Sequence, residues 1–276
     1  MNVTGRRASV LGLVWTGATL SVGAQPADRN IVLMTTTSVR DAGLLQVLIP
    51  PFEEASGYAV RVVAVGTGQA IALARQGEAD LLIVHDPEAE ERFIGAGYGV
   101  RRWPMMRNAF AIVGPRDDPA GVRDRGPVEA FRDIATARVR FVSRDDGSGT
   151  HSREQRLWQA AGIRPAGGWY LGSGQGMAAT LEIAHELGAY ALTDLATFLT
   201  HARELQLALL VSGDSLLDNR YDIIDVNPER FAWLNEIGAV ALRDYLLSGP
   251  VQARIASFGR REFGRSLFRP VHTSVP

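Results

Sequence analysis

Short apolar runs alternate with segments of helical periodicity along the first part of the chain. Residues 31–34, 60–65 and 81–84 are mainly apolar and have the length of strands, and the segments after them carry apolar residues at a spacing of three or four. In the segment of residues 44–52, Pro50 and Pro51 predict a kink or a division of the helix. Strands that alternate with helices in this way predict an α/β protein with a mainly parallel sheet.

A second set of strands and helices begins after a polar stretch. The apolar residues 110–113 run into Gly114 and Pro115, and turn-forming residues follow up to residue 126. Further strands are expected near residues 139–142, 169–171, 190–193, 207–211 and 221–226, and residues 231–246 have helical periodicity. We therefore predict two lobes, residues 25–113 with 216–276 and residues 114–215, each a mainly parallel sheet flanked by helices. Because ligands of open α/β sheets bind at the carboxyl ends of strands, a ligand should lie in the cleft between the lobes.

The N-terminus has the pattern of a secretory signal peptide. Arg6 and Arg7 precede an apolar stretch over residues 8–22, and small residues lead to Ala24. The apolar stretch is shorter than the roughly 20 residues that a membrane span needs. We predict that residues 1–24 are removed and that the mature protein works in the periplasm without spanning the membrane. The residues after the arginine pair favour the Sec route over the twin-arginine route.

Composition excludes several classes of function. Apolar residues make up 46% of the chain and charged residues 21%, as in a soluble globular protein, and a net charge of -1 gives no field that would recruit nucleic acid. Cysteine is absent, which excludes disulfides, thiolate metal sites and cysteine nucleophiles. The five histidines form no close pair for zinc, so we expect no metal cation.

Four loops at the predicted strand-to-helix junctions carry hydroxyls and glycines. They are residues 35–38 (Thr-Thr-Thr-Ser), 66–69 (Gly-Thr-Gly-Gln), 143–151 (Ser-Arg-Asp-Asp-Gly-Ser-Gly-Thr-His) and 172–176 (Gly-Ser-Gly-Gln-Gly). Glycines let the backbone approach a ligand closely, and the N–H groups at a helix N-terminus favour an anion. Each loop alone is also compatible with an ordinary helix N-cap or a tight turn. Two such loops in each lobe, gathered at one cleft, indicate an anion site.

Arg144 is the cation of the longest of these loops. Its guanidinium offers a fixed fork of donors that matches an oxyanion. The alternative role is a surface ion pair with Asp145 or Asp146, which would contribute little to stability. We predict a ligand contact, with one of the two aspartates orienting the guanidinium, because a buried cation needs a partner.

Enzymatic alternatives fit the sequence poorly. Neither Ser148 nor Ser173 lies in a Gly-x-Ser-x-Gly motif, and a nucleotide-binding phosphate loop needs a lysine, which the chain lacks. Gly172, Gly174 and Gly176 do not match the dinucleotide fingerprint. An enzyme acting on an anionic substrate, the alternative from another class, would need a nucleophile, a base or a cofactor at the cleft. We therefore expect a binding protein with no catalytic residues and no cofactor.

The loops and the segments around them closely resemble the periplasmic tungstate-binding proteins of bacterial ABC importers. The segments that carry the resemblance occur in one order along nearly the whole chain after the signal peptide: residues 35–38, 64–70, 80–85, 143–151, 174–177, 188–194 and 226–228. The resemblance implies a type II periplasmic-binding-protein fold, with two lobes and two crossings, that closes around one oxyanion. It also implies a monomeric receptor that delivers tungstate or molybdate to an ABC permease with its ATPase.

The resemblance further implies which residues contact the anion. The expected contacts are Thr37, Ser38, Thr67, Arg144, Ser148, Gly149 and Thr150. Residues expected directly behind them are Thr36, Gly66, Asp146, Gln175 and Gly176.

Protonation is the physical basis for choosing among oxyanions. Tungstate and molybdate carry no proton near neutral pH, so they only accept hydrogen bonds, and a carboxylate that faced them would repel them. Phosphate carries a proton and would gain from such an acceptor, so a receptor for phosphate or another oxyanion is the alternative. The choice depends on whether Asp145 or Asp146 faces the anion or Arg144. A receptor whose partner is a sensor protein is a further alternative.

Overall fold

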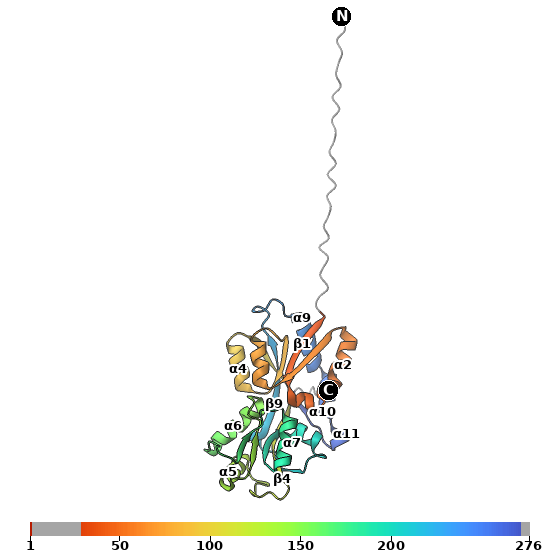
Figure 1. The fold of residues 1–276 in the computed structure, drawn as a ribbon. Helices are drawn as coiled ribbons and strands as arrows, with labels where there is room; N and C mark the ends of the chain where they lie inside the picture. Colours follow the sequence, from red (N-terminus) through yellow and green to blue (C-terminus); the bar gives the residue numbers. More distant parts are fainter. Residues whose placement is uncertain (2–28, 272–276) are drawn as a thin grey trace.

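Two lobes joined by two long strands make up the part of the chain that the computed structural model describes, residue 1 and residues 29–271 (Figure 1). The predicted signal peptide lies, except for Met1, outside the described residues. Among the residues described, no helix has the length and apolar character needed to cross a bilayer.

The first lobe is built on a sheet whose central strands are parallel. β1 (Asn30–Thr36) pairs in parallel with β2 (Ala59–Val65) on one side and with β3 (Leu81–Val84) on the other. Thr36 at the end of β1 lies opposite Val65 at the end of β2. The loops that leave these two strands therefore start side by side at one edge of the sheet.

The second lobe combines parallel and antiparallel pairing. β5 (Phe141–Ser143) pairs in parallel with β6 (Tyr170–Gly172), while β7 (Ala191–Asp194) and β8 (Leu207–Val211) run antiparallel to β4 (Gly99–Pro115). An isolated parallel bridge between Phe141 and Tyr190 links β5 to the start of β7. The expected alternation of strands and helices is confirmed in both lobes.

β4 and β9 (Asp218–Val226) are the strands that connect the lobes. β4 pairs with β9 from Gly99 to Ala109 and then with β7 from Phe110. The change of partner thus precedes the predicted boundary after residue 113. Gly114 and Pro115, which we expected at the crossing, instead pair with β8 in the second lobe. The first half of β4 was not predicted because Arg101, Arg102 and Pro104 break its apolar pattern.

Helices cover both faces of each sheet, so each lobe has two apolar cores. Leu33 and Met34, neighbours in β1, belong to different cores, as expected for a strand that is buried on both faces. The helices of the first lobe are α1 (Thr37–Asp41), α2 (Leu44–Ser56), α3 (Thr67–Ala74), α4 (Pro87–Gly95), α9 (Glu236–Leu247), α10 (Gly249–Ser257) and α11 (Arg260–Phe263), with the short strand β10 (Arg269–Pro270). Those of the second lobe are α5 (Pro127–Ala137), α6 (Gly149–Ala161), α7 (Met177–Leu187), α8 (Leu195–His201) and the 3-10 turn η1 (Ser215–Leu217).

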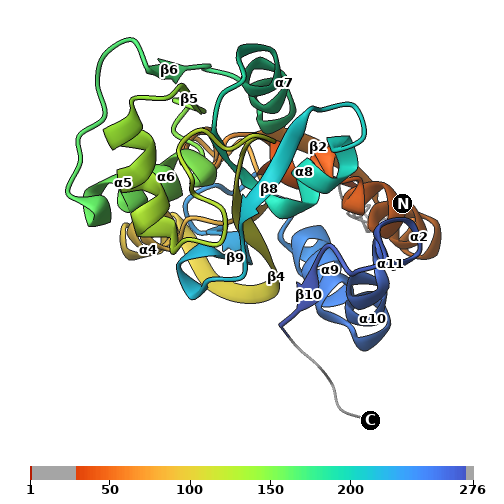
Figure 2. The same cartoon turned by 90° about the horizontal axis from the view of Figure 1, so that it is seen from below.

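The C-terminal helices lie beside the first lobe, away from α5 and α6 (Figure 2). Their apolar residues, such as Leu246 and Ile255, join Leu48 of α2 in one core. The helix predicted around residues 44–52 is present, and it runs undivided through Pro50 and Pro51.

Candidate functional site

All four predicted loops lie at strand-to-helix junctions, and contacts across the lobes show that they converge. The backbone N–H of Gly68 in the first lobe donates to the carbonyl of Gly147 in the second, at 3.3 Å. Nη2 of Arg144 lies 3.5 Å from Oγ1 of Thr37, again across the lobes. α1, which carries Thr37, also packs against α7 and α8 of the second lobe. The lobes are therefore closed on one another around these loops.

Arg144 is the buried cation of this junction, with only 2% of its side chain exposed. Its Nε donates to the carbonyl of Gln175 at 3.2 Å, and its Nη2 is hydrogen-bonded and ion-paired to Asp146. The other carboxylate oxygen of Asp146 accepts from the backbone N–H of Ser148 at 3.1 Å. Asp146 thus fixes the guanidinium against its own loop, the orienting role that we predicted for one of the two aspartates.

Asp145 takes no part in this arrangement. Its side chain is 63% exposed and lies beside His151, with 3.8 Å between Oδ1 and Nε2. Its backbone is left-handed, at a φ of 46°, which turns the chain between β5 and α6. Of the two adjacent aspartates, one is therefore committed to Arg144 and the other faces solvent.

Three of the predicted contact residues have buried hydroxyls without a partner. Oγ of Ser38, Oγ1 of Thr67 and Oγ1 of Thr150 make no hydrogen bond within the described part of the chain. An unsatisfied buried hydroxyl costs about 1–3 kcal/mol, so such groups are normally paired with protein, water or ligand. Their coincidence at one junction, beside a buried guanidinium, is the arrangement of donors that an oxyanion would satisfy.

Other predicted residues serve the loops themselves. Oγ1 of Thr36 accepts from Val39 N at the start of α1, and Oγ of Ser148 accepts from His151 N at the start of α6. These are the N-cap roles that we weighed as the alternative. The Ser148 hydroxyl keeps its proton as a donor, whereas its backbone N–H is already taken by Asp146. Gly66 and Gly176 occupy the N-cap positions of α3 and α7.

Gly149 and Gly68 occupy positions where no side chain fits. A Cβ at position 149 would lie 2.7 Å from the ring of His85, and one at position 68 would lie 2.7 Å from the carbonyl oxygen of Gly147. Both contacts join the first lobe to the second. The two glycines are therefore needed where the lobes approach most closely.

His85 is a buried residue at the end of β3 that contacts the site through Gly149. Its Nδ1 lies 2.8 Å from Oδ1 of Asn219. Because Nδ2 of Asn219 donates to Asn108 and to Tyr221, Oδ1 is the acceptor and Nδ1 of His85 carries the proton. Burial lowers the pKa of His85 to about 4, so the ring is neutral at pH 7. We interpret it as a structural histidine whose Nδ1 proton is satisfied by Asn219.

Asp194 is a residue of this junction that the sequence analysis did not single out. It is fully buried at the end of β7, and its Oδ1 caps α8 by accepting from Thr197 N at 2.9 Å. Its Oδ2 makes no hydrogen bond of good geometry within the described part of the chain, although the hydroxyls of Ser38 and Thr197 lie close to the carboxyl. Burial raises the pKa of Asp194, against the opposing influence of Thr197, Ser38 and Arg144. An aspartate between a strand and a helix usually predicts an N-cap. The local sequence does not indicate that Asp194 lies beside Ser38.

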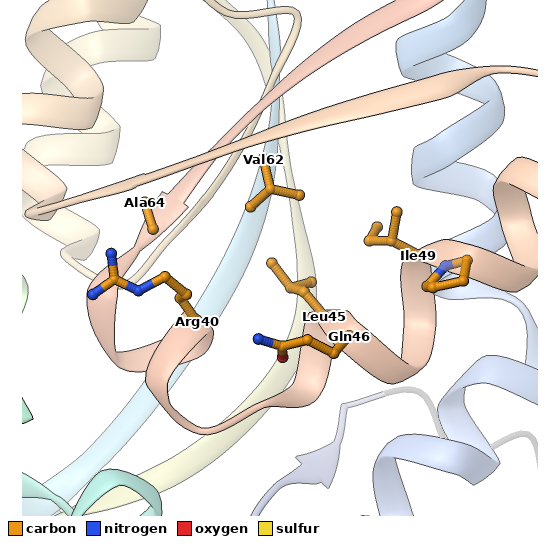
Figure 3. A pocket seen from close by; sticks show the side chains of 7 residues that line it. Arg40, Leu45, Gln46, Ile49, Val62 and Ala64 are labelled. Carbon is orange, nitrogen blue, oxygen red and sulfur yellow. The ribbon is translucent and has the colours of Figure 1, made fainter.

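Arg40, the other cation near these loops, lies away from the junction. Half of its side chain is exposed, and it pairs with Asp41 at 2.8 Å. It lines a mainly apolar groove of about 340 Å³ between α2 and β2, together with Leu45, Ile49 and Val62 (Figure 3). Arg144 is therefore the cation that the loops bring to the junction.

Comparison with known proteins shows the family to which the chain belongs. Residues 22–248 match the family described as a PBP superfamily domain. The chain is 41% identical to the tungstate-binding protein TupA of Peptoclostridium acidaminophilum over 88% of its own length and 86% of that protein. It is also similar to two crystal structures. The tungstate ABC transporter protein of Geobacter sulfurreducens is 41% identical with a TM-score of 0.75, covering 82% of this chain and 97% of that one. The tungstate-binding protein TupA of Desulfovibrio alaskensis G20 is 37% identical with a TM-score of 0.73, covering 88% and 99%.

Proposed function

The chain belongs to the PBP superfamily, in one family with the tungstate-binding proteins, and on that premise we propose that it is an extracytoplasmic receptor for tungstate. One observation carries the proposal beyond family membership. Three unpartnered buried hydroxyls lie beside a buried guanidinium, where helix N-termini of both lobes meet. The anion would lie between them and accept hydrogen bonds from Thr37, Ser38, Thr67, Arg144, Ser148, Gly149 and Thr150.

The donor set favours a proton-free oxyanion. Asp146, the carboxylate paired with Arg144, is engaged by the guanidinium and by Ser148 N, so it is not free to accept a proton from a ligand. Tungstate and molybdate only accept hydrogen bonds, whereas hydrogen phosphate also donates one. Asp194 supports a second candidate, because its unpartnered Oδ2 would suit the proton of hydrogen phosphate if the carboxyl were ionised. A rise in the pKa of Asp194 opposes that role and favours the proton-free anions.

The receptor would work by closing. The two lobes would move as two bodies about β4 and β9, and an anion touching both would favour the closed arrangement. The protein would act as a periplasmic monomer, exported through a cleaved signal peptide by the Sec route. It would hand tungstate to an ABC permease with its ATPase. The site offers hydroxyls, backbone N–H groups and one arginine, which suits binding without catalysis or a cofactor.

Competitive calorimetry with tungstate, molybdate, sulfate and phosphate tests the proposal. We expect tungstate and molybdate to bind more tightly than sulfate and phosphate. Arg144→Ala should cost about 2–5 kcal/mol of binding, since it leaves the anion without its buried cation. Arg40→Ala, which removes an exposed cation outside the junction, is the matched control and should leave affinity unchanged. Phosphate binding more tightly than tungstate, or an unchanged affinity in Arg144→Ala, would overturn the proposal. Incubation with phosphate esters tests the enzymatic alternative, for which turnover would be required.

A further inference from the structure

A second cluster of arginines lies at the strands that connect the lobes. A cavity of about 290 Å³, which we call the hinge cavity, is lined by His85, Arg107, Arg153, Asp218, Asn219 and Arg220. Arg107 belongs to β4, residues 218–220 belong to β9, and Arg153 belongs to α6 of the second lobe. None of the residues proposed to contact tungstate lines this cavity. Its walls therefore come from both lobes and from both connecting strands.

The arginines of the hinge cavity have N–H groups that are not all used in hydrogen bonds within the described part of the chain. Arg153 uses Nη1 and Nη2 to donate to the carbonyls of Leu216 and Asp218, at 3.0 and 3.2 Å. Its Nε is buried and has no partner in the described part of the chain. Arg107 has one charged neighbour, Asp218, at 4.0 Å, and both of these side chains are about half exposed or more. An ion pair at this distance, between side chains this exposed, neutralises little of the charge of Arg107.

The remaining charges of the hinge cavity leave an excess of cations. Arg220 is paired with the buried carboxylate of Asp222, at 3.0 Å from Nε and 2.8 Å from Nη2. Among the lining residues, Asp218 is the carboxylate nearest Arg107 and Arg153. Asp86 and Glu88 also act on Arg153 from behind the lining, but both are paired with Arg156, at 3.5 and 3.2 Å. An anion in the hinge cavity would give the donors of Arg107 and Arg153 a further partner.

We propose that the hinge cavity is a second anion-binding site, which takes a compact oxyanion of the sulfate or phosphate class. Guanidinium forks match the oxygen edges of such anions, and the small volume excludes most larger ligands. The site does not depend on which anion occupies the cleft.

The position of the hinge cavity predicts coupling to the cleft. α6 carries Thr150 at its N-terminus and Arg153 about one turn later, so an anion on Arg153 also positions the loop that meets the cleft anion. His85 forms a wall of the hinge cavity and touches Gly149 on its other side. An anion that bridges Arg153 and Arg107 therefore favours the same closed arrangement that tungstate requires. Coupling of this kind is reciprocal and typically changes affinity about 5-fold to 150-fold.

Calorimetry of tungstate binding with and without sulfate tests the coupling. Ionic strength is matched with sodium chloride, because exposed charges are screened by any salt. In the wild type we expect sulfate to tighten tungstate binding about fivefold or more. Arg107→Gln should abolish the sulfate effect and leave tungstate affinity without sulfate unchanged. Arg101→Gln, at another exposed arginine of β4, is the matched control and should behave as the wild type. If sulfate weakens tungstate binding equally in wild type and Arg107→Gln, sulfate acts only in the cleft and the proposal fails.

Crystals grown with tungstate and selenate locate the second anion directly. The two elements differ in anomalous scattering, so we expect tungsten in the cleft and selenium between Arg107 and Arg153. Selenium in the hinge cavity without any sulfate effect in solution would mean an adventitious ion only, and would also overturn the proposal. Sulfate binding to Arg144→Ala separates this proposal from the proposed function. Sulfate should still bind there with the hinge cavity intact and should be lost on adding Arg107→Gln, whether or not tungstate is the cleft ligand.

Discussion

The guanidinium of Arg144 and the carboxylate of Asp146 form an ion pair within a single loop, two residues apart. The same carboxylate accepts from Ser148 N, so it connects the cation to the start of α6. Asp146 thereby orients the donor that faces the cleft instead of facing the cleft itself.

Asp146→Asn should weaken tungstate binding by about tenfold to a hundredfold. The change removes a charged hydrogen-bond partner of Arg144, and such bonds contribute about 1.5–3 kcal/mol. Calorimetry measures the loss of tungstate affinity, with Asp145→Asn as the matched control. The side chain of Asp145 is exposed and lies beside His151, not in an ion pair with Arg144. Equal effects of the two substitutions would contradict the orienting role of Asp146.

Gly68→Ala should weaken anion binding by obstructing closure. The added Cβ would lie 2.7 Å from the carbonyl oxygen of Gly147 in the other lobe. Relieving a clash of this kind typically costs about 1–3 kcal/mol, and here the cost falls on the closed form. Gly168→Ala is the control, since a Cβ there meets nothing within 4 Å. Calorimetry compares tungstate binding by the two variants. If both bind tungstate as tightly as the wild type does, the predicted obstruction of closure at Gly68 is wrong.

The residues of the junction differ in how far the sequence predicted them. The loops that carry Thr67, Arg144 and Thr150 were predicted because they follow strand-length apolar runs, and the carboxyl ends of such strands meet at one edge; the family resemblance then named Thr67 and Thr150. The hydrogen bond from the backbone N–H of Ser148 to Asp146 could not be predicted, because it depends on the path of the loop. Asp194 was missed because its local pattern is that of any N-cap. Its burial beside Ser38 results from the packing of α8 against α1, which no local pattern encodes.

The extent of β4 shows a similar limit at the level of the fold. Residues 110–113 were predicted from their apolar run, whereas residues 99–109 are strand because they pair with β9, far along the sequence. Long-range pairing of this kind overrides weak local preference. The boundary after residue 113 was predicted from the turn residues Gly114 and Pro115, whereas the pairing of β4 changes from β9 to β7 between Ala109 and Phe110.

Asp194→Asn should stabilise the anion-free protein at neutral pH. Burial raises the pKa of Asp194, so its ionised form is disfavoured in the folded state. A group of this kind contributes stability below its unfolded pKa and loses that contribution as pH rises through its folded pKa. Asparagine retains an oxygen to cap α8 and cannot ionise. Thermal unfolding at pH 7 should therefore show a higher midpoint for the variant, and the difference should shrink on acidification below pH 4.

Asp86→Asn is the matched control for Asp194→Asn, since Asp86 caps α4 in the same way. The pKa of Asp86 is lowered, because a hydrogen bond from Ser152 and the charge of Arg156 outweigh its burial. Its contribution is present above its unfolded pKa and is lost as pH falls, so removal of the charge should destabilise the protein at pH 7. A lower midpoint in both variants would show that the charged carboxylate of Asp194 stabilises the folded protein, as that of Asp86 does, and would contradict the prediction.

His85 should make folding sensitive to mild acid. Burial lowers the pKa of His85 from 6.5 to about 4, so the unfolded chain binds this proton at a higher pH than the folded protein does. Stability should therefore be full above pH 6.5 and fall as pH drops from 6.5 toward 4. The loss would approach about 3 kcal/mol from this group, taking about 1.4 kcal/mol per unit of pKa.

Denaturant unfolding between pH 8 and pH 4 should show a steeper loss of stability in the wild type than in His85→Gln, which cannot take up the proton. The slopes are compared rather than the absolute stabilities, because the substitution also removes the contacts of His85 with Asn219 and Gly149. Parallel slopes would mean that His85 does not contribute to acid sensitivity.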